Sequence, residues 1–334
     1  MVQPYELGLH LPVKLSNEVL STTTEVWQML EAAKSGDIAR VKQMAKDCPA
    51  LVYAQYNYTP PIHLAVREGH RELVQYLLSL GAHDPHYKTY PFQETLQVVA
   101  KDRGYLDIEA ALNACAGNAG LHKYQGDNGE ILYDRSQQQS DFEKAVAAND
   151  LEKTEMFLQK EPTFALDQTY FWSEGILTFA AKENNRDMID LLVSYGAKVP
   201  GILKWAQYYY LEHDEGAAYI LEHGMSPNTM SWHHVTVLHD MAQKGNLGKA
   251  ALLIAHGASL NVIDDEYQST PLGLAAKWGH KPMVQYLLSC GADPITAGAA
   301  WATPMAWAMA KGYDEIAALL AIAINKKQDE NYSS

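Results

Sequence analysis

The chain has 334 residues, of which 47% are hydrophobic and 20% are charged, and its formal net charge is −14. This composition is typical of soluble folded proteins and argues against bulk disorder. Binding to nucleic-acid phosphates requires a basic surface, and the longest Lys/Arg run is the pair Lys326–Lys327. We therefore expect no nucleic-acid partner, no anionic membrane surface and a bias toward basic partners.

The cysteines and the first residues bear on the compartment. Cys48, Cys115 and Cys290 are widely spaced and odd in number, which predicts neither a disulfide framework nor a zinc site. A reducing compartment fits this usage best. Residues 1–20 lack the basic start and continuous apolar run of a secretory signal, and no stretch reaches the roughly 18 apolar residues of a membrane span. We expect a cytoplasmic protein.

Two distant segments have nearly the same sequence. Residues 59–82 read TPPIHLAVREGHRELVQYLLSLGA, and residues 269–292 read STPLGLAAKWGHKPMVQYLLSCGA. Both contain a proline turn, a short apolar stretch, Gly-His, Val-Gln-Tyr-Leu-Leu-Ser and Gly-Ala. The pattern resembles the ankyrin repeat, in which T-P-L-H-x-A-A is followed by G-H, L-L and G-A. This resemblance implies an all-α solenoid of helix–turn–helix units joined by short β-hairpin-like fingers.

Each part of the pattern has a physical role. Thr270 can cap a helix, and Pro271 suits its first turn. Gly279 permits the positive φ of a tight turn between the two helices. Leu287 and Leu288 belong to the apolar stripe of the second helix, so we expect a continuous apolar core along the stack.

The turn residue gives the period. Glycines 36, 69 and 104 are 33 and 35 residues apart, and glycines 245, 279 and 312 are 34 and 33 apart, close to the ankyrin value of about 33. Asn149 and Asn184 fill the same place, because Asn tolerates a left-handed conformation. With a further turn near His213, we predict about nine units.

We predict five regions in chain order. They are an N-terminal extension or cap at 1–23, repeats 1–3 at 24–113, an insert at 114–140, repeats 4–9 at 141–324 and a tail at 325–334. The extension either caps the first unit or forms a flexible arm. Within the insert, Asn128-Gly129 lies between two potential strands and favours a hairpin finger, with an unstructured loop as the alternative. The sixth unit, 202–224, is unusually short.

The resemblance also implies a concave face, lined by the fingers and by the ends of the first helices. Aromatic side chains there would give large contact areas at small entropic cost, as binding hot spots do. Their density favours the part of the face from Trp172 to Trp301, although each ring could instead pack against the neighbouring finger. The predicted binding residues are Tyr56, Arg67, Glu68, Phe92, Phe171, Trp172, Lys182, Glu183, Trp232, His233, Glu266, Tyr267, Lys277, Trp278 and Trp301.

Motifs for chemistry are missing from the sequence. It contains no G-x-S-x-G, Walker or H-E-x-x-H motif. His63 and His239 match the histidine of T-P-L-H, which is structural in this family, while His233 and His234 lack the spacing of metal ligands. We expect no catalytic residue, no cofactor and no metal.

Three function hypotheses follow. The leading one is a non-catalytic protein–protein interaction scaffold that binds its partner through the concave face. The alternative is a small-ligand or glycan-binding module with an aromatic-lined pocket. An enzyme of unrecognised type is the third, and perturbed carboxylates converging in a pocket would favour it.

Overall fold

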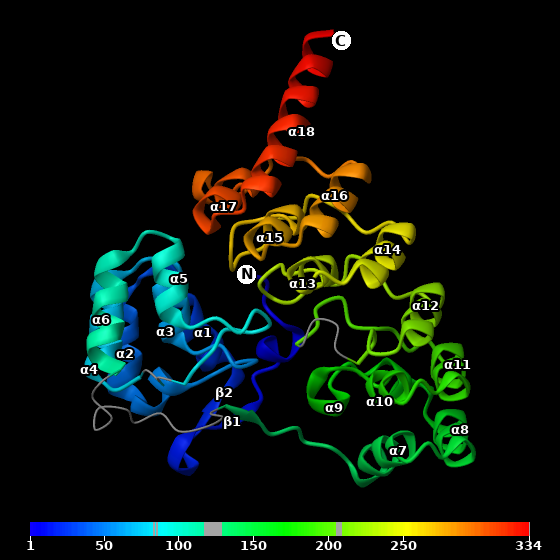
Figure 1. The fold of residues 1–334 in the computed structure, drawn as a ribbon. Coiled ribbons are helices and arrows are strands. Elements are labelled where there is room, and N and C mark those ends of the chain that lie inside the picture. The colour runs from blue at the N-terminus through cyan, green and yellow to red at the C-terminus, as the bar shows by residue number, and fades with distance from the viewer. Residues whose placement is uncertain (83, 85, 117–128, 205–208, 334) are drawn as a thin grey trace. The chain divides into compact units, whose positions relative to one another are not determined.

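A computed structural model describes residues 1–82, 84, 86–116, 129–204 and 209–333. Within these ranges the chain is mostly helical and divides into two compact units. The first, which we call the N-terminal unit, is Gln3–Asp134, and the second, the C-terminal unit, is Arg135–Ser334 together with Met1–Val2. Both consist largely of helix pairs, as the all-α prediction requires (Figure 1).

In eight of the repeats, one helix precedes a tight turn and a second helix follows it; we call the first the inner helix and the second the outer helix. In the N-terminal unit the pairs are α1 (Thr23–Ser35) with α2 (Ile38–Asp47), α3 (Pro61–Arg67) with α4 (Arg71–Ser79), and α5 (Leu96–Asp102) with α6 (Leu106–Ala116). In the C-terminal unit they are α7 (Gln137–Ala147) with α8 (Leu151–Lys160), α10 (Thr178–Lys182) with α11 (Arg186–Ser194), α13 (Val237–Lys244) with α14 (Leu247–Ala255), α15 (Pro271–Lys277) with α16 (Lys281–Ser289), and α17 (Pro304–Lys311) with α18 (Asp314–Ser333). Successive inner helices α13, α15 and α17 contact one another, so these repeats form a stack (Figure 1).

The left-handed turns between the paired helices are confirmed. Eight of the nine predicted turn residues have φ between +52° and +79°: Gly36, Gly69, Gly104, Asn149, Asn184, Gly245, Gly279 and Gly312. At His213 the prediction is wrong, because its φ is −98° and it is the N-cap of α12 (Asp214–Glu222). In the sixth repeat, the described residues of 202–212 contain no inner helix, so α12 stands as an outer helix without a regular partner.

The N-terminal extension is folded. Strand β1 (Pro12–Lys14) pairs antiparallel with β2 (Leu20–Thr22) and also with β3 (Glu130–Ile131), with Val13 opposite both Ser21 and Ile131. Short 3-10 turns at Tyr5–Gly8 and Ser16–Glu18 complete the segment, and Leu7 and Leu15 are buried. Most of the predicted hairpin in the insert lies outside the described residues, and its second potential strand, β3, pairs with β1.

The core follows the helical period. Leu287 of α16 is fully buried, whereas its neighbour Leu288 is half-buried. Adjacent residues of a helix lie about 100° apart around its axis, so only one of them faces the core directly. The same holds for Leu191 and Leu192 of α11, of which Leu192 is buried.

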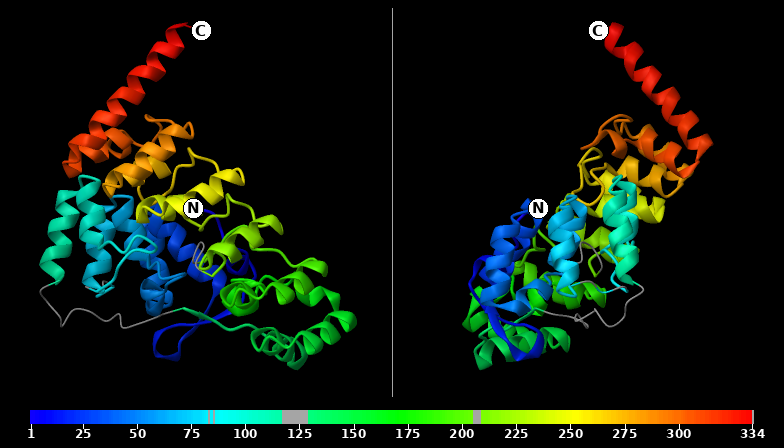
Figure 2. Two further views of the ribbon diagram at one scale, coloured as in Figure 1. Left: turned by 45° about the vertical axis from the view of Figure 1, so that its right-hand side comes forward. Right: turned by 90° about the vertical axis from the view of Figure 1, so that its left-hand side faces the viewer.

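The last helix extends beyond its repeat. The carboxyl-terminal part of α18 projects past α16 and α17 in all the views of Figures 1 and 2. Lys327 ties it to the loop after α16 through an ion pair of 2.5 Å with Asp293, and this contact helps to hold the pKa of the Asp293 carboxyl below its ordinary value despite partial burial. Among the described helices, none is both long and apolar enough to cross a membrane.

A glycine in the turn permits the left-handed backbone and also leaves room for the next repeat. Two variants separate these effects. Gly245 has φ +67°, and a Cβ there would lie 2.7 Å from Nδ1 of His280, whereas a Cβ on Gly312, at φ +75°, meets nothing within 4 Å. We predict that Gly312→Ala costs about 1–2 kcal/mol for the left-handed backbone. Gly245→Ala should cost a further 1–3 kcal/mol or so for the overpacking. Urea unfolding followed by circular dichroism measures both, and equal losses would show that His280 moves aside freely.

We predict that the protein loses stability in acid because His239, in the seventh repeat, is buried. Burial lowers the pKa of His239 from 6.5 to about 4, although its hydrogen bonds to the carbonyl oxygens of Val262 and Ser269 act in the opposite direction. Between pH 6.5 and pH 4, His239 is therefore protonated in the unfolded chain and neutral in the folded chain. This contribution is fully present above pH 6.5 and falls by about 1.4 kcal/mol per pH unit toward pH 4. The His239→Gln variant should be less stable than wild type at pH 7.5. Between pH 6.5 and pH 4, urea unfolding should show a smaller loss of stability for this variant than for wild type.

Candidate binding surface

Threonine caps hold the fingers against the inner helices. The side chains of Thr236, Thr270 and Thr303 accept hydrogen bonds from the backbone N–H groups three residues later, which start α13, α15 and α17. Ser, Thr and Asp side chains at this place satisfy N–H groups that the helix itself leaves unpaired. The three fingers that precede α13, α15 and α17 therefore end at such a cap, which fixes where each finger joins its inner helix.

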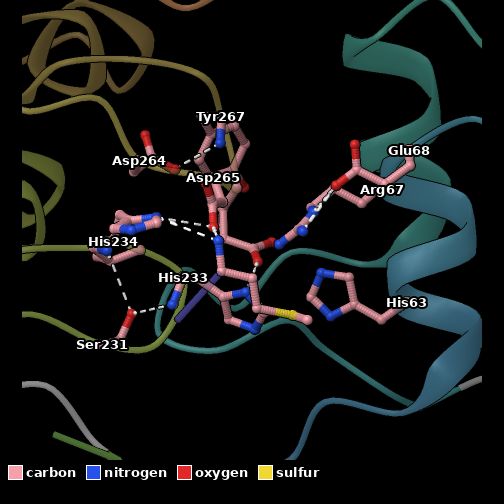
Figure 3. A network of polar contacts seen from close by, with 12 residues as sticks. His63, Arg67, Glu68, Ser231, His233, His234, Asp264, Asp265 and Tyr267 are labelled. Carbon is pink, nitrogen blue, oxygen red and sulfur yellow. Dashed lines mark hydrogen bonds and ion pairs between the residues drawn. The ribbon is translucent and has the colours of Figure 1, made fainter. Parts of the chain in front are cut away.

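Two neighbouring fingers of the C-terminal unit are joined by acid–histidine contacts (Figure 3). His233 Nδ1 lies 3.5 Å from Glu266 Oε1, and His234 Nδ1 lies 3.1 Å from Asp265 Oδ2. The N–H of Asp265 also donates to the carbonyl of His233 at 2.9 Å. Asp264 shapes its own finger by accepting the backbone N–H of Tyr267 at 2.6 Å. These contacts make the predicted site residues His233 and Glu266 part of the joint between fingers.

Four predicted aromatic and basic residues meet in one cluster. The ammonium of Lys277 lies 4.7 Å from the ring centre of Tyr267 and 4.3 Å from that of Trp278. It also lies 5.0 Å from the ring of Trp307, which makes an edge contact with Trp301. Tyr267 and Trp278 contact each other edge to face at 5.3 Å. Such cation–ring and ring–ring contacts stabilise the packing between repeats.

Burial separates the predicted binding residues into three groups. Half-buried residues are Glu68, Trp278 and Trp301. Exposed residues are Trp172, Lys182 and Glu183, with Trp172 exposing 69% of its surface. Buried residues are Tyr56, Arg67, Phe92, Phe171, Trp232, His233, Glu266, Tyr267 and Lys277.

Most of the predicted residues of the N-terminal unit are buried. The hydroxyl of Tyr56 donates to Glu6 Oε1 at 2.6 Å, within a finger whose tip, Asn57–Tyr58, is left-handed. Arg67 donates to Glu68 Oε1 through Nε and Nη2, at 3.0 and 2.8 Å (Figure 3). Phe92 is buried. Only Glu68 of this set is partly open to solvent.

The exposed residues lie together in the fifth repeat. The ammonium of Lys182 lies 5.7 Å from the ring of Phe179, which contacts the ring of Phe171 at 4.4 Å. Trp172 follows directly, and Glu183 follows Lys182. We call Phe171, Trp172, Phe179, Lys182 and Glu183 the repeat-5 surface.

The backbone under Trp172 is unusual. In the segment labelled α9 in Figure 1 (Tyr170–Ser173), Phe171, Trp172 and Ser173 have φ of +51°, +57° and +65°, which makes one left-handed turn. Non-glycine residues pay about 1–2 kcal/mol each for this conformation. Such strain persists only where the surroundings determine it, and it concentrates at functional sites.

Arg135 and two carboxylates hold this turn. Glu143 Oε1 accepts the backbone N–H of Phe171 at 2.7 Å, and Arg135 lies beside Glu143 and Asp167 at 3.6 and 3.7 Å. Arg135 also donates to the carbonyl of Thr169 at 2.6 Å, and its guanidinium lies 4.4 Å from the ring centre of Tyr170. All three charged side chains are largely withdrawn from solvent. The sequence does not predict this network, because Arg135, Glu143 and Asp167 lie 8 and 24 residues apart along the chain and share no motif.

A second group below the turn is titratable near neutral pH. Burial raises the pKa of Glu174 from 4.5 to about 7, with Lys204 acting in the opposite direction. Its carbonyl accepts the hydroxyl groups of Thr178 and Tyr210, both at 2.9 Å. Thr178 fills the place that His239 holds in the seventh repeat, so the repeat-5 finger is anchored by hydroxyl groups instead of an imidazole.

The side chains of the repeat-5 surface are suited to binding. Across the described residues, no three His, Cys, Asp or Glu side chains are grouped as metal ligands. The repeat-5 surface offers one exposed indole, an exposed ammonium, an exposed carboxylate and a backbone held by hydrogen bonds. These groups can bury apolar area and make directed ion pairs.

Known proteins match parts of the chain. Models of ankyrin repeats match residues 229–297, as three copies, and residues 57–90, as one repeat. The chain is 36% identical over 80 residues to ARF GTPase-activating protein GIT2 of Mus musculus, and 39% over 79 residues to protein fem-1 homolog A-like of the same species. It is 35% identical over 80 residues to ARF GTPase-activating protein GIT1 of Homo sapiens.

These matches are partial. Each covers 24% of this chain and only 11%, 12% and 10% of the respective relative. They therefore concern repeats and not whole proteins. Together with the left-handed turns at the repeat period and the paired helices that they connect, the matches show that the chain is an ankyrin-repeat protein.

Proposed function

We propose that this protein is a non-catalytic scaffold that binds another protein through the inner face of its repeats, with the repeat-5 surface as the centre of contact. Ankyrin repeats are protein-interaction modules, and repeat arrays commonly use the inner face for binding. The carrying observation is that Trp172, Lys182 and Glu183 are the predicted binding residues that are exposed. The wider predicted face runs from Trp232 to Trp301 and remains a prediction. Within it, Trp278 and Trp301 are half-buried and so partly accessible to a partner.

The inner helix α7 contacts α10 of the fifth repeat and ends in two small residues. Ala147 and Ala148, which end the inner helix of the fourth repeat, are exposed and small. A partner can therefore approach the backbone there and reach Lys182 and Glu183 in the next repeat. The net charge of −14 favours a basic partner, since opposite charge speeds association. A cytoplasmic setting is part of the same proposal.

A small-ligand or glycan-binding module is the second candidate. The cluster of Tyr267, Trp278, Trp301 and Trp307 motivates it, because sugars and cations bind to aromatic faces. Lys277 already lies among three of these rings, and Tyr267 is buried. We therefore favour the protein partner. The matched relatives share only about a tenth of their length with this chain, and we propose no GTPase-activating role for it.

Exchanging two neighbouring charges tests the proposed face without changing the net charge. We predict that Lys182→Glu combined with Glu183→Lys weakens partner binding at least tenfold, because both side chains are exposed at the end of the inner helix α10. Affinity capture from an extract of the source cells, followed by titration calorimetry with the captured partner, measures the loss.

The matched control makes the same exchange on an outer helix. Glu152→Lys with Lys153→Glu changes two exposed residues of α8 and should leave binding as in wild type. If both double variants bind equally well, the inner face of repeat 5 is not the contact. If the wild-type chain captures no protein above background, the scaffold proposal itself falls.

A further inference from the structure

We propose that residues 167–175 form a preformed anchor whose Trp172 indole enters an apolar pocket of a folded partner, and that Arg135 and Glu143 are positioning residues for it. This inference rests on the scaffold function proposed above and specifies how the partner is held. Its basis is the combination of an exposed indole, a left-handed backbone and a half-buried ion network that holds this backbone.

The exposed side chain of Trp172 is carried by a backbone whose neighbouring side chains are buried. An indole that exposes 69% of its surface contributes little to the core, yet it stands between Phe171 and Ser173, which are both buried. With three consecutive left-handed residues, the two neighbours are buried and Trp172 is turned outward. A glycine or asparagine would make such a turn at lower cost, as Asn149 and Asn184 do elsewhere in this chain. The strained turn therefore serves to present Trp172.

The network below the turn fixes its conformation before any partner arrives. Glu143 accepts the N–H of Phe171 at 2.7 Å, and Arg135 is held in turn by Glu143, Asp167 and the carbonyl of Thr169. Phe171 packs on Phe179 at 4.4 Å from the other side. A side chain held in its bound conformation loses little entropy on binding, which is how rigid aromatic anchors gain affinity.

The shape of the anchor indicates the kind of partner. An indole that is open on most sides is buried completely only by a concave surface, whereas an extended peptide lying in a groove covers one face of the ring. The indole N–H is a donor and requires an acceptor when it is buried. The partner pocket is therefore apolar with one acceptor in its wall. A lipid surface is disfavoured, because the carboxylates of Glu143 and Asp167 accept hydrogen bonds from Phe171 and Thr169 at the turn.

Two substitutions at one position test the left-handed backbone. Ser173→Ala keeps the Cβ and Ser173→Gly removes it, and both remove the hydroxyl. Since φ of Ser173 is +65°, the Gly variant should have a folded-to-unfolded ratio about tenfold above that of the Ala variant, measured by urea unfolding. A Gly variant that is no more stable than the Ala variant would overturn the anchor.

Photo-crosslinking identifies what receives the indole. In the full chain, Trp172→p-benzoylphenylalanine is irradiated in the source cells, with the same substitution at Lys182 as the reference. Crosslinks from position 172 to residues that line a cavity of a folded protein support the proposal. Crosslinks to lipid, crosslinks to an extended segment, or none from 172 while 182 reacts, would each overturn it. No crosslink from either position would remove the scaffold function together with the anchor.

The positioning role has its own readout. Glu143→Gln retains an oxygen that accepts the N–H of Phe171, and Glu143→Ala does not. Glu143→Ala should raise hydrogen exchange at Phe171 at least tenfold and weaken binding of the crosslinked partner about as much as Trp172→Ala does, with Glu143→Gln closer to wild type. If Trp172→Ala binds normally while the Lys182/Glu183 exchange does not, the scaffold stands and the anchor falls.

Discussion

One hydrogen bond recurs at three junctions between repeats and holds each of these repeats on the one before it. The imidazole Nε2 of a histidine at the start of an outer helix donates to a carbonyl near the end of the preceding inner helix. It joins His70 to Lys34 at 2.7 Å, His213 to Lys182 at 2.9 Å and His280 to Gln243 at 2.8 Å. The carbonyl would otherwise lack a partner, since the last carbonyls of a helix have none within it.

This bond depends on the turn residue beneath it. The ring of His280 lies so close to Gly245 that a Cβ would approach it to 2.7 Å, and Gly36 stands in the same relation to His70. At these two junctions a residue without a Cβ allows both the left-handed turn and the close approach of the next repeat. At the third junction, His213 makes the same bond although the turn residue there is Asn184, which has a Cβ. The sixth repeat keeps the bond through His213 although it has no regular inner helix among its described residues, so the stacking contact is retained where the local helix pattern is not.

Charged side chains on the inner helices are buried in some repeats and exposed in others. Asp240 of α13 is fully buried, at the place where the second repeat has Leu64, and it is tied to the half-solvated Lys244 at 2.7 Å. Lys277 of the next inner helix is buried among aromatic rings. Buried charges of this kind need partners, because the loss of hydration is otherwise large. In the fifth repeat, by contrast, Lys182 and Glu183 face solvent beside the exposed Trp172. In the proposed function, that contrast separates residues that hold repeats together from residues that contact the partner.

The sequence by itself determined the fold, because the ankyrin pattern is local: a cap, a proline turn, a left-handed residue and an apolar stripe act within about 33 residues. Eight of the turn residues could be named from spacing alone. Tertiary structure decided which aromatic residues of the predicted face are accessible, since Tyr267 and Trp232 contact rings of Trp278 and His233, while Trp172 is turned outward. It also paired β1 with β3 and brought Arg135, Glu143 and Asp167 together. These outcomes depend on contacts between residues distant in the chain, which no single repeat encodes.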